Sequence, residues 1–214
     1  MKHEAIVSFP DQAPGMTRRA MAKQRTRQRL LGAARRLFTS RGYEAATIRD
    51  IASAADLSTG AVFASFSDKA DLFNEVIIAD WEALFEQMAS VEDAGSAADT
   101  LLNLLTLGYD QHQEQLPLTQ AALSFSWVRN PEHETRYRKI ARLVLNRLAE
   151  VLSEGVERGE LSAELDVQLT SEMLMDSYMA NFRKAIFDNW GVETLRARLE
   201  SQIAVLLAGY RAAA

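Results

Sequence analysis

The chain has 214 residues, of which 48% are hydrophobic, with ten glycines, four prolines and no cysteine. The lack of cysteine excludes a disulfide framework and a thiolate metal site, and the apolar content argues against wholesale disorder. The net charge of −5 is unevenly spread, because residues 1–72 carry 12 Lys and Arg against 7 Asp and Glu, whereas residues 73–214 carry 12 against 22.

The basic part of the chain predicts a polyanionic partner. Nine basic residues and no acidic ones lie between Thr17 and Arg41. On charge alone, a solvated basic face or a disordered tail is an equally good interpretation. The N-terminal apolar run is too short for a signal peptide, and no run approaches the ~20 apolar residues of a membrane span. We therefore expect a soluble, cytoplasmic protein that makes no membrane contact.

In chain order, residues 1–22 are predicted to form a flexible basic arm, since they contain Pro10, Pro14 and Gly15 and no apolar period. From about Arg25, apolar residues recur at spacings of three and four, which predicts an amphipathic helix. Gly42 is expected to end this helix in a left-handed conformation.

Two short helices are predicted next. Thr47 is an expected N-cap, and Asp50 completes a capping box. Ser58 is expected to cap the second helix, and Asp56 is expected to adopt a positive φ in the turn between them. Small alanines allow the two helices to cross closely, so the pattern is that of a helix-turn-helix. Gly60 costs ~1 kcal/mol relative to alanine in a helix, which indicates that an external surface approaches the backbone there.

The rest of the chain predicts six longer helices and no strand. The first runs to Met88, and five more are expected over 96–112, 116–129, 131–158, 166–189 and 192–211. Asn130 and Asp166 are expected N-caps, and Gly159 and Gly191 are expected stop signals. The fold class is therefore all-α, with about nine helices.

The segment from Arg27 to Phe73 resembles the N-terminal domain of the tetracycline-repressor (TetR-type) family of transcriptional regulators. The residues that carry the resemblance, all in register, are Ala33, Ala34, Leu37, Phe38, Gly42, Tyr43, Thr47, Ile51, Ala52, Leu57, Ser58, Gly60, Phe66, Lys69 and Leu72. Three positions depart from the family pattern: Ala46 replaces a frequent Thr or Ser, Asp56 replaces the turn glycine, and Phe63 replaces a frequent phosphate-binding Tyr.

This resemblance implies three domains: the arm at 1–22, a helix-turn-helix DNA-binding domain at 23–72, and a helical effector-binding and dimerisation domain at 73–214. Thr47 and Lys69 would contact phosphates, and Ser58 to Ala61 would open the recognition helix in the major groove. The full set expected to touch DNA is Arg25, Thr47, Ile48, Arg49, Ser58, Thr59, Gly60, Ala61, Phe63, Ala64 and Lys69.

The recognition helix has no Arg, Asn or Gln for a bidentate base contact. We therefore expect Arg49, or the arm around Arg18, Arg19 and Lys23, to contribute part of the specificity. A disordered arm without DNA contact is the alternative.

The resemblance also implies a dimer and an effector pocket. The apolar stripes of the last two helices are expected at the homodimer interface, through Met175, Met179, Phe182, Ile186, Leu195, Leu199, Ile203, Leu206 and Tyr210. Burial in one subunit's own core is the alternative. A pocket for a small-molecule effector is expected to be lined by Trp81, Phe85, Met88, Leu104, Tyr109, Phe125, Trp127, Met173 and Tyr178, although such residues are more often ordinary core.

These features together predict a ligand-responsive transcriptional regulator that binds a palindromic operator in duplex DNA as a dimer, with repression expected over activation. An enzyme is the first alternative, but nucleophile, P-loop and dinucleotide motifs are absent, and no catalytic residue, cofactor or metal is expected. His112, near Asp110 and Glu114, is interpreted as a solvated residue on a helix exterior. The second alternative is a helical adaptor whose basic part binds another protein or an acidic membrane.

Overall fold

A computed structural model describes residues 17–211, and this part of the chain is built from nine α-helices. The helices are α1 (Arg18–Ala45), α2 (Ile48–Ala54), α3 (Thr59–Phe63), α4 (Lys69–Met88), α5 (Ala97–Gln113), α6 (Leu116–Phe125), α7 (Pro131–Glu157), α8 (Val167–Asp188) and α9 (Val192–Leu207), followed by a 3₁₀ turn, Ala208–Tyr210. Over residues 17–211 there is no strand, only an isolated bridge between Leu161 and Arg211. The predicted all-α class is confirmed. No helix in this range has the length and apolarity of a membrane span.

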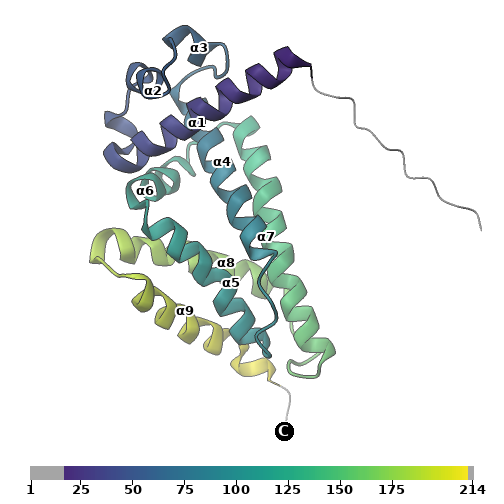
Figure 1. Cartoon of the computed structure of the whole chain (residues 1–214). Helices are drawn as coiled ribbons and strands as arrows, with labels where there is room; N and C mark the ends of the chain where they lie inside the picture. Colours follow the sequence, from purple (N-terminus) through teal and green to yellow (C-terminus); the bar gives the residue numbers. More distant parts are fainter. Residues whose placement is uncertain (1–16, 212–214) are drawn as a thin grey trace, which may run out of the picture.

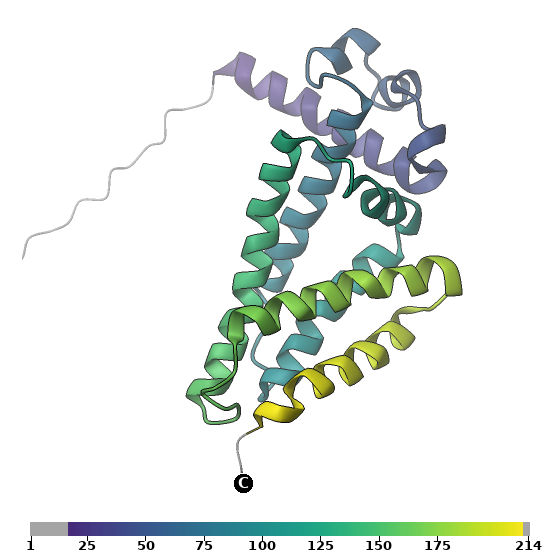
Figure 2. The same ribbon diagram turned by 180° about the vertical axis from the view of Figure 1, so that it is seen from behind.

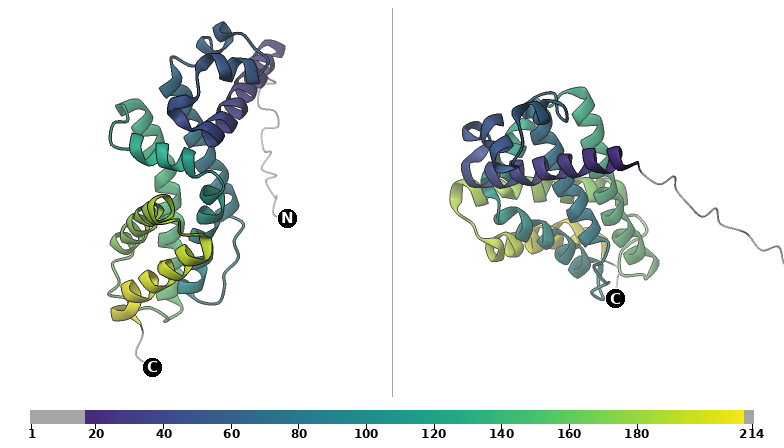
Figure 3. Two further views of the ribbon diagram at one scale, coloured as in Figure 1. Left: turned by 90° about the vertical axis from the view of Figure 1, so that its left-hand side faces the viewer. Right: turned by 45° about the horizontal axis from the view of Figure 1, so that its top comes forward.

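The helices form a small head and a larger body (Figure 1). The head consists of α1, α2 and α3, and α4 runs from it into the body beside α7. Seen from behind, α8 and α9 lie side by side along the body, and α9 also packs on α5 (Figure 2). The molecule is elongated, and α4 and α6 are the body helices that pack against α1 (Figure 3).

Helix α1 begins at Arg18, not near Arg25. The Thr17 side chain caps it by accepting a hydrogen bond from the Ala20 N–H at 3.2 Å. The intervening residues Ala20 to Lys23 are good helix formers, so propensity extends the helix beyond the apolar stripe. The predicted arm is therefore too long, because residues 18–22 are helical. Its residues 1–16 lie outside the described part of the chain.

The local geometry of the helix-turn-helix agrees with the sequence patterns. The Thr47 hydroxyl accepts from the Asp50 N–H at 3.1 Å, and the Asp50 carboxylate accepts from the Thr47 N–H at 3.3 Å. The Ser58 hydroxyl accepts from the Ala61 N–H at 3.2 Å. Asp56 adopts φ 52° in the turn, and Gly42 has φ 79°. The capping box, the Ser58 cap and both positive φ angles are confirmed, although the ψ of 166° at Gly42 is extended and not left-handed helical.

One helix end and one stop signal differ from the sequence expectation. Helix α6 ends at Phe125, four residues early, and leaves Trp127 and Val128 exposed. Helix α8 is ended by Asn189 in the left-handed conformation, whereas Gly191 is the N-cap of α9. Asn tolerates the left-handed region better than most residues, so the stop lies two residues before the glycine.

One apolar core continues from the head into the body. Tyr43 of α1 packs on Phe125 of α6, with ring centroids 4.5 Å apart. Phe73 of α4 packs on Phe125 and on Phe38, with ring centroids 5.2 and 5.4 Å apart. We call these four rings the head–body cluster. Phe125 packs in this cluster and does not line the body cavity described below.

Candidate functional site

The outer surface of the head is formed by α2 and α3. Ser58, Thr59 and Gly60, at the leading end of α3, are exposed, and so is Phe63, at 59%. Of the other predicted DNA contacts, Arg25, Thr47, Arg49 and Ala64 are exposed, and Ile48 and Ala61 are half-buried. The structure thus brings ten of the eleven predicted contact residues to the surface of the head.

Gly60 is not required by the protein's own packing. A Cβ built on it would meet only the Ser58 hydroxyl, at an ordinary 3.6 Å. Its φ lies outside the positive range, so an alanine would suffer no backbone strain. Neither space nor backbone conformation within the protein therefore requires glycine at this position.

Lys69 has a structural position in place of the predicted phosphate contact. Its ammonium group donates to the carbonyls of Tyr43, Ala46 and Glu44 at 2.7, 3.0 and 3.3 Å. It also lies 4.2 Å from the centre of the Tyr43 ring. An ammonium has three N–H donors, and all three are used here. Lys69 therefore ties the start of α4 to the end of α1.

Three of the basic residues of α1 also point inward. Arg27 donates to the Ser65 carbonyl at 2.9 Å and stacks on Phe66. Arg29 donates to the Ala55 carbonyl at 2.6 Å, within the helix-turn-helix. Arg35 pairs with Asp80 of α4. Part of the positive charge of α1 is thus used in contacts within the protein.

Two buried carboxylates of α4 link the head to the body. The Glu75 side chain, 8% exposed, pairs with Arg27 of α1 and with Arg136 of α7. The Asp80 side chain, 3% exposed, pairs with Arg35 of α1. Breaking such a pair leaves an uncompensated buried charge, which destabilises proteins strongly. These ion pairs therefore fix the position of α1 on α4.

A group of potential metal ligands lies beside Glu75. His133 Nε2 is 3.0 Å from Asp71 Oδ1, and a Glu75 oxygen lies within 4.8 Å of both donor atoms. Asp71 also accepts from the Ser67 N–H at 2.8 Å, and Glu75 is already paired with two arginines. The negative charge of this group is therefore balanced within the protein, which makes it a polar link between α4 and α7.

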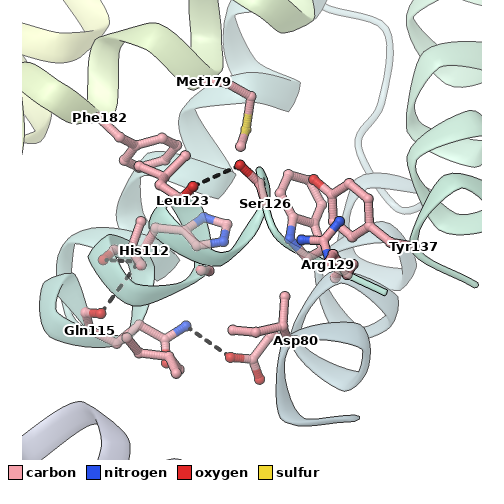
Figure 4. A pocket seen from close by; sticks show the side chains of 14 residues that line it. Asp80, His112, Gln115, Leu123, Ser126, Arg129, Tyr137, Met179 and Phe182 are labelled. Atoms are coloured by element: carbon pink, nitrogen blue, oxygen red, sulfur yellow. Dashed lines mark hydrogen bonds between the residues drawn. The ribbon is translucent and has the colours of Figure 1, made fainter. Parts of the chain in front are cut away.

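The body contains a partly enclosed cavity of about 30 Å³ between α4, α5, α6, α7 and α8. That volume holds no more than a few water molecules. Figure 4 shows its wall, in which Asp80, His112, Gln115, Arg129 and Tyr137 lie among apolar side chains. The complete lining is Ile77, Asp80, Trp81, His112, Gln115, Leu118, Thr119, Ala122, Leu123, Ser126, Arg129, Tyr137, Met179 and Phe182.

Only Trp81 of the predicted ligand residues lines this cavity. Met88, Leu104, Tyr109 and Tyr178 are fully buried elsewhere in the core, and the Tyr109 and Tyr178 rings stack at 4.7 Å. Phe85 packs half-buried against the core. Met173 is 45% exposed on α8, and Trp127 is 91% exposed after α6. Trp127 lines an outer groove that shares Leu123, Ser126 and Met179 with the cavity wall.

The polar part of the wall was missed at the sequence level. His112, interpreted as a solvated residue, is buried, and its Nδ1 lies 2.6 Å from the Gly108 carbonyl. Burial lowers the pKa of His112, and this hydrogen bond opposes the shift only in part. The imidazole is therefore neutral. Asp80 carried a usable signal, since it interrupts the apolar run Ile77-Ile78-Ala79-Asp80-Trp81.

The predicted dimer residues divide into two groups. The buried side of α9 packs against α5 and includes Leu195, Leu199 and Ile203. Phe182 is buried in the cavity wall. The prediction of these four residues as interface residues is therefore wrong. The monomer's own core uses these stripes. Met175, Met179, Ile186, Leu206 and Tyr210 are half-buried.

The outward faces of α8 and α9 carry a different apolar set. Leu169, Met173 and Phe187 on α8 are 52%, 45% and 65% exposed, and Val205 on α9 is 76% exposed. Ala180, Ala197, Ser201 and Ala204 are exposed on the same two helices. We call this set the α8–α9 face.

Comparisons with known proteins agree on one family. Residues 30–76 match the family model described as "Bacterial regulatory proteins, tetR family". The chain is 27% identical over 166 residues to the HTH-type transcriptional repressor KstR2 of Rhodococcus jostii, covering 72% of this chain and 77% of that protein. It is 21% identical over 154 residues to the regulator UidR of Escherichia coli K12, covering 72% and 78%.

Solved structures share the whole fold. A TetR transcription regulator from Haloarcula marismortui superposes with a TM-score of 0.73 at 20% identity, covering 88% of this chain and 99% of that one. The transcriptional regulator FadR of Bacillus subtilis, in complex with stearoyl-CoA, superposes with a TM-score of 0.71 at 20% identity, covering 85% and 98%. The head-and-body arrangement is thus common to these proteins.

Proposed function

Because the chain belongs to the TetR family of ligand-responsive transcriptional regulators, we propose that it binds a duplex DNA operator as a homodimer, through α2 and α3. The observation that carries this proposal is the exposed leading end of α3, where Ser58, Thr59 and the uncrowded Gly60 face outward. An exposed helix of a helix-turn-helix is suited to the major groove, and a two-fold dimer reads a palindromic site.

Specificity would come from few side chains. Thr59 can hydrogen-bond to base edges, and Ala64 can meet a thymine methyl. Arg49 is exposed on the neighbouring helix α2 and is the nearest candidate for a bidentate contact with guanine or phosphate. Arg18, Arg19 and Lys23 are exposed on the first turns of α1, so they would act from a helix and not from an extended arm.

Selection of duplexes from random-sequence DNA by the purified protein tests this proposal. Bound fragments should converge on an inverted repeat whose half-sites are one helical turn, about 34–36 Å, apart. Affinity should fall steeply with salt, and Arg49→Ala should reduce the salt slope by about one unit if Arg49 contacts a phosphate. Failure to enrich any sequence would refute the proposal.

The dimer would form through the α8–α9 face. Val205 and the small residues around it on α9 allow close helix approach, and the exposed apolar side chains of α8 flank them. Val205→Glu should convert the dimer to a monomer in light scattering and weaken operator binding. Leu143→Glu provides a matched control, since Leu143 is 44% exposed but lies on α7, outside this face. A wild-type protein that is monomeric at all concentrations would reject the dimer.

The effector would bind in the cavity beside α4. The stearoyl-CoA of the FadR complex is not carried over to this chain, because the cavity here is far smaller than an acyl-CoA and its wall contains a buried carboxylate. A ligand larger than a few waters must move the wall helices, which include α4. Repression, relieved when ligand binds, is the proposed direction. A regulator of chromosomal genes acts where the chromosome lies, so the cytoplasm is the proposed location.

A further inference from the structure

Asp80 belongs both to the cavity wall and to the link between head and body. One carboxylate oxygen contacts the guanidinium of Arg35 on α1, and the other lies 3.4 Å from Gln115 Nε2 in the cavity wall. Figure 4 shows the carboxylate and the Gln115 amide side by side at one end of the cavity. A ligand in the cavity would therefore meet the group that holds α1.

The two partners of this ion pair differ in burial. The Asp80 side chain is 3% exposed, whereas the Arg35 side chain is 44% exposed. Arg35 can turn into solvent and regain its hydration at small cost, but Asp80 cannot. A buried carboxylate without a counter-charge is strongly unfavourable, so Arg35 can leave only if another cation takes its place.

The remaining wall groups favour a cation at this position. Trp81 and Tyr137 contribute aromatic surface to the wall, and His112 is neutral. The other charged wall residue, Arg129, is already paired with Glu134 at 3.0 Å and stacked 4.1 Å from the centre of the Tyr137 ring. Asp80 is therefore the wall charge whose present partner can be exchanged.

We propose that Asp80 is the effector-sensing residue, and that the effector is an aromatic or apolar cation whose amidinium or ammonium group replaces Arg35 on the Asp80 carboxylate. This inference rests on the proposed function, because it assumes that the cavity is the effector site. Amidinium groups match carboxylates with two parallel hydrogen bonds. Met179 and Leu123 give the opposite wall the adaptability to widen around the apolar part of the ligand.

The exchange would release α1 at one of its ties to α4. The Glu75 pairs with Arg27 and Arg136 lie outside the cavity and would remain. Helix α1 would then be held by the Lys69 and Glu75 ties and could turn about the line that joins them, which changes the spacing of the two recognition helices in a dimer. By linkage, DNA that favours the paired Arg35–Asp80 state must weaken ligand binding by the same factor by which ligand weakens DNA binding.

Three probes of nearly equal size test the charge requirement: benzamidine, neutral benzamide and anionic benzoate. Binding is followed by the fluorescence of Trp81, with Trp81→Phe identifying its share of the signal. The wild-type protein should bind benzamidine about tenfold or more tightly than the other two. Asp80→Asn should abolish this preference. Glu75→Gln is the matched control, because it removes the other buried carboxylate that pairs with α1 without touching the cavity, and it should leave the preference intact.

Arg35→Gln gives a separate signature. This variant leaves Asp80 without its cation. Benzamidine should therefore bind to the variant about tenfold more tightly than to the wild type, and it should raise the melting temperature of the variant more than that of the wild type. Benzamidine should weaken wild-type binding to the selected duplex, and this effect should disappear in Arg35→Gln and in Asp80→Asn. The melting measurement also serves as the test if Arg35→Gln is unstable, since the cation should then rescue its fold.

Equal affinity for benzamidine and benzamide, or an unchanged preference in Asp80→Asn, would overturn the inference. The inference would also be overturned if benzamidine bound through Asp80 but did not alter the affinity of the wild-type protein for DNA. Failure of the proposed function would look different. The wild type would then select no duplex, while the preference for benzamidine and its dependence on Asp80 would still establish the cation site.

Discussion

Replacing Gly60 by alanine should move stability and DNA affinity in opposite directions. The added Cβ would meet only the Ser58 hydroxyl, at 3.6 Å, and Gly60 does not have a positive φ. Alanine therefore fits without strain. Because alanine restricts the unfolded chain more than glycine does, Gly60→Ala should raise the free energy of unfolding by about 0.4–1 kcal/mol.

The same methyl group should weaken operator binding. Gly60 is exposed in the first turn of α3, at the end proposed to enter the major groove. A methyl group in a close-fitted contact costs about 1–3 kcal/mol, as overpacking does in protein cores. The dissociation constant should therefore increase roughly 5- to 150-fold for each half-site.

Fluorescence anisotropy with the selected duplex measures the affinity, and urea denaturation measures the stability. Gly32→Ala is the control, because its Cβ would also meet only one atom, Arg36 Nη1 at 3.7 Å, and Gly32 lies on α1, outside the α2–α3 surface. It should stabilise the protein and leave the affinity unchanged. If Gly60→Ala binds DNA as tightly as the wild type, the leading end of α3 does not approach the duplex closely and the reasoning is refuted.

Two further predictions concern the body. Gly108→Ala should destabilise the protein by about 1–3 kcal/mol, because its Cβ would lie 2.0 Å from the Tyr178 hydroxyl oxygen, and the double variant with Tyr178→Phe should recover part of the loss in urea denaturation. Burial lowers the pKa of His112, so the folded protein binds fewer protons than the unfolded chain once the pH falls below the unfolded pKa of about 6.5. The free energy of unfolding should therefore fall by up to about 1.4 kcal/mol for each pH unit toward acid, until the pH reaches the lowered pKa of the folded state. His112→Asn should flatten this part of the plot of stability against pH. An unchanged plot would contradict a neutral imidazole at His112.

Features determined by neighbouring residues could be predicted from the sequence. The Thr47 capping box, the Ser58 and Asp166 caps and the positive φ of Asp56 each depend on contacts within a few residues, and each is present. The start of α1 was misplaced because the apolar stripe begins later than the helix. Capping and propensity, which act without burial, decide the first turns.

The cavity could not be predicted in the same way, because its wall depends on which face of each helix meets another helix. Tyr109 and Tyr178 are equally aromatic and equally plausible as ligand contacts, yet they stack on each other, 69 residues apart in sequence. The α9 stripe through Leu195 could face either a partner or the subunit's own α5, and helical periodicity is identical in both cases. Asp80 could have been singled out from the sequence, since a charged residue within an apolar run indicates an ion pair in the interior. The sequence does not indicate that the partner is Arg35.

Helix α4 is the element by which a change at the cavity can reach the head. Its first residue, Lys69, bonds to carbonyls at the end of α1, Glu75 pairs with Arg27, and Asp80 pairs with Arg35. These three ties to α1 are spread over the first 12 of the helix's 20 residues, or about 18 Å of helix length. Loss of the Asp80 tie alone leaves two fixed points, and the head–body cluster also keeps α1 packed on α4. Two fixed points leave α1 free to turn only about the line that joins them, so the geometry favours a change in the orientation of the head over a loosening of the whole domain. For a dimer that must match two half-sites, a small change of angle at each head is sufficient to lose the fit.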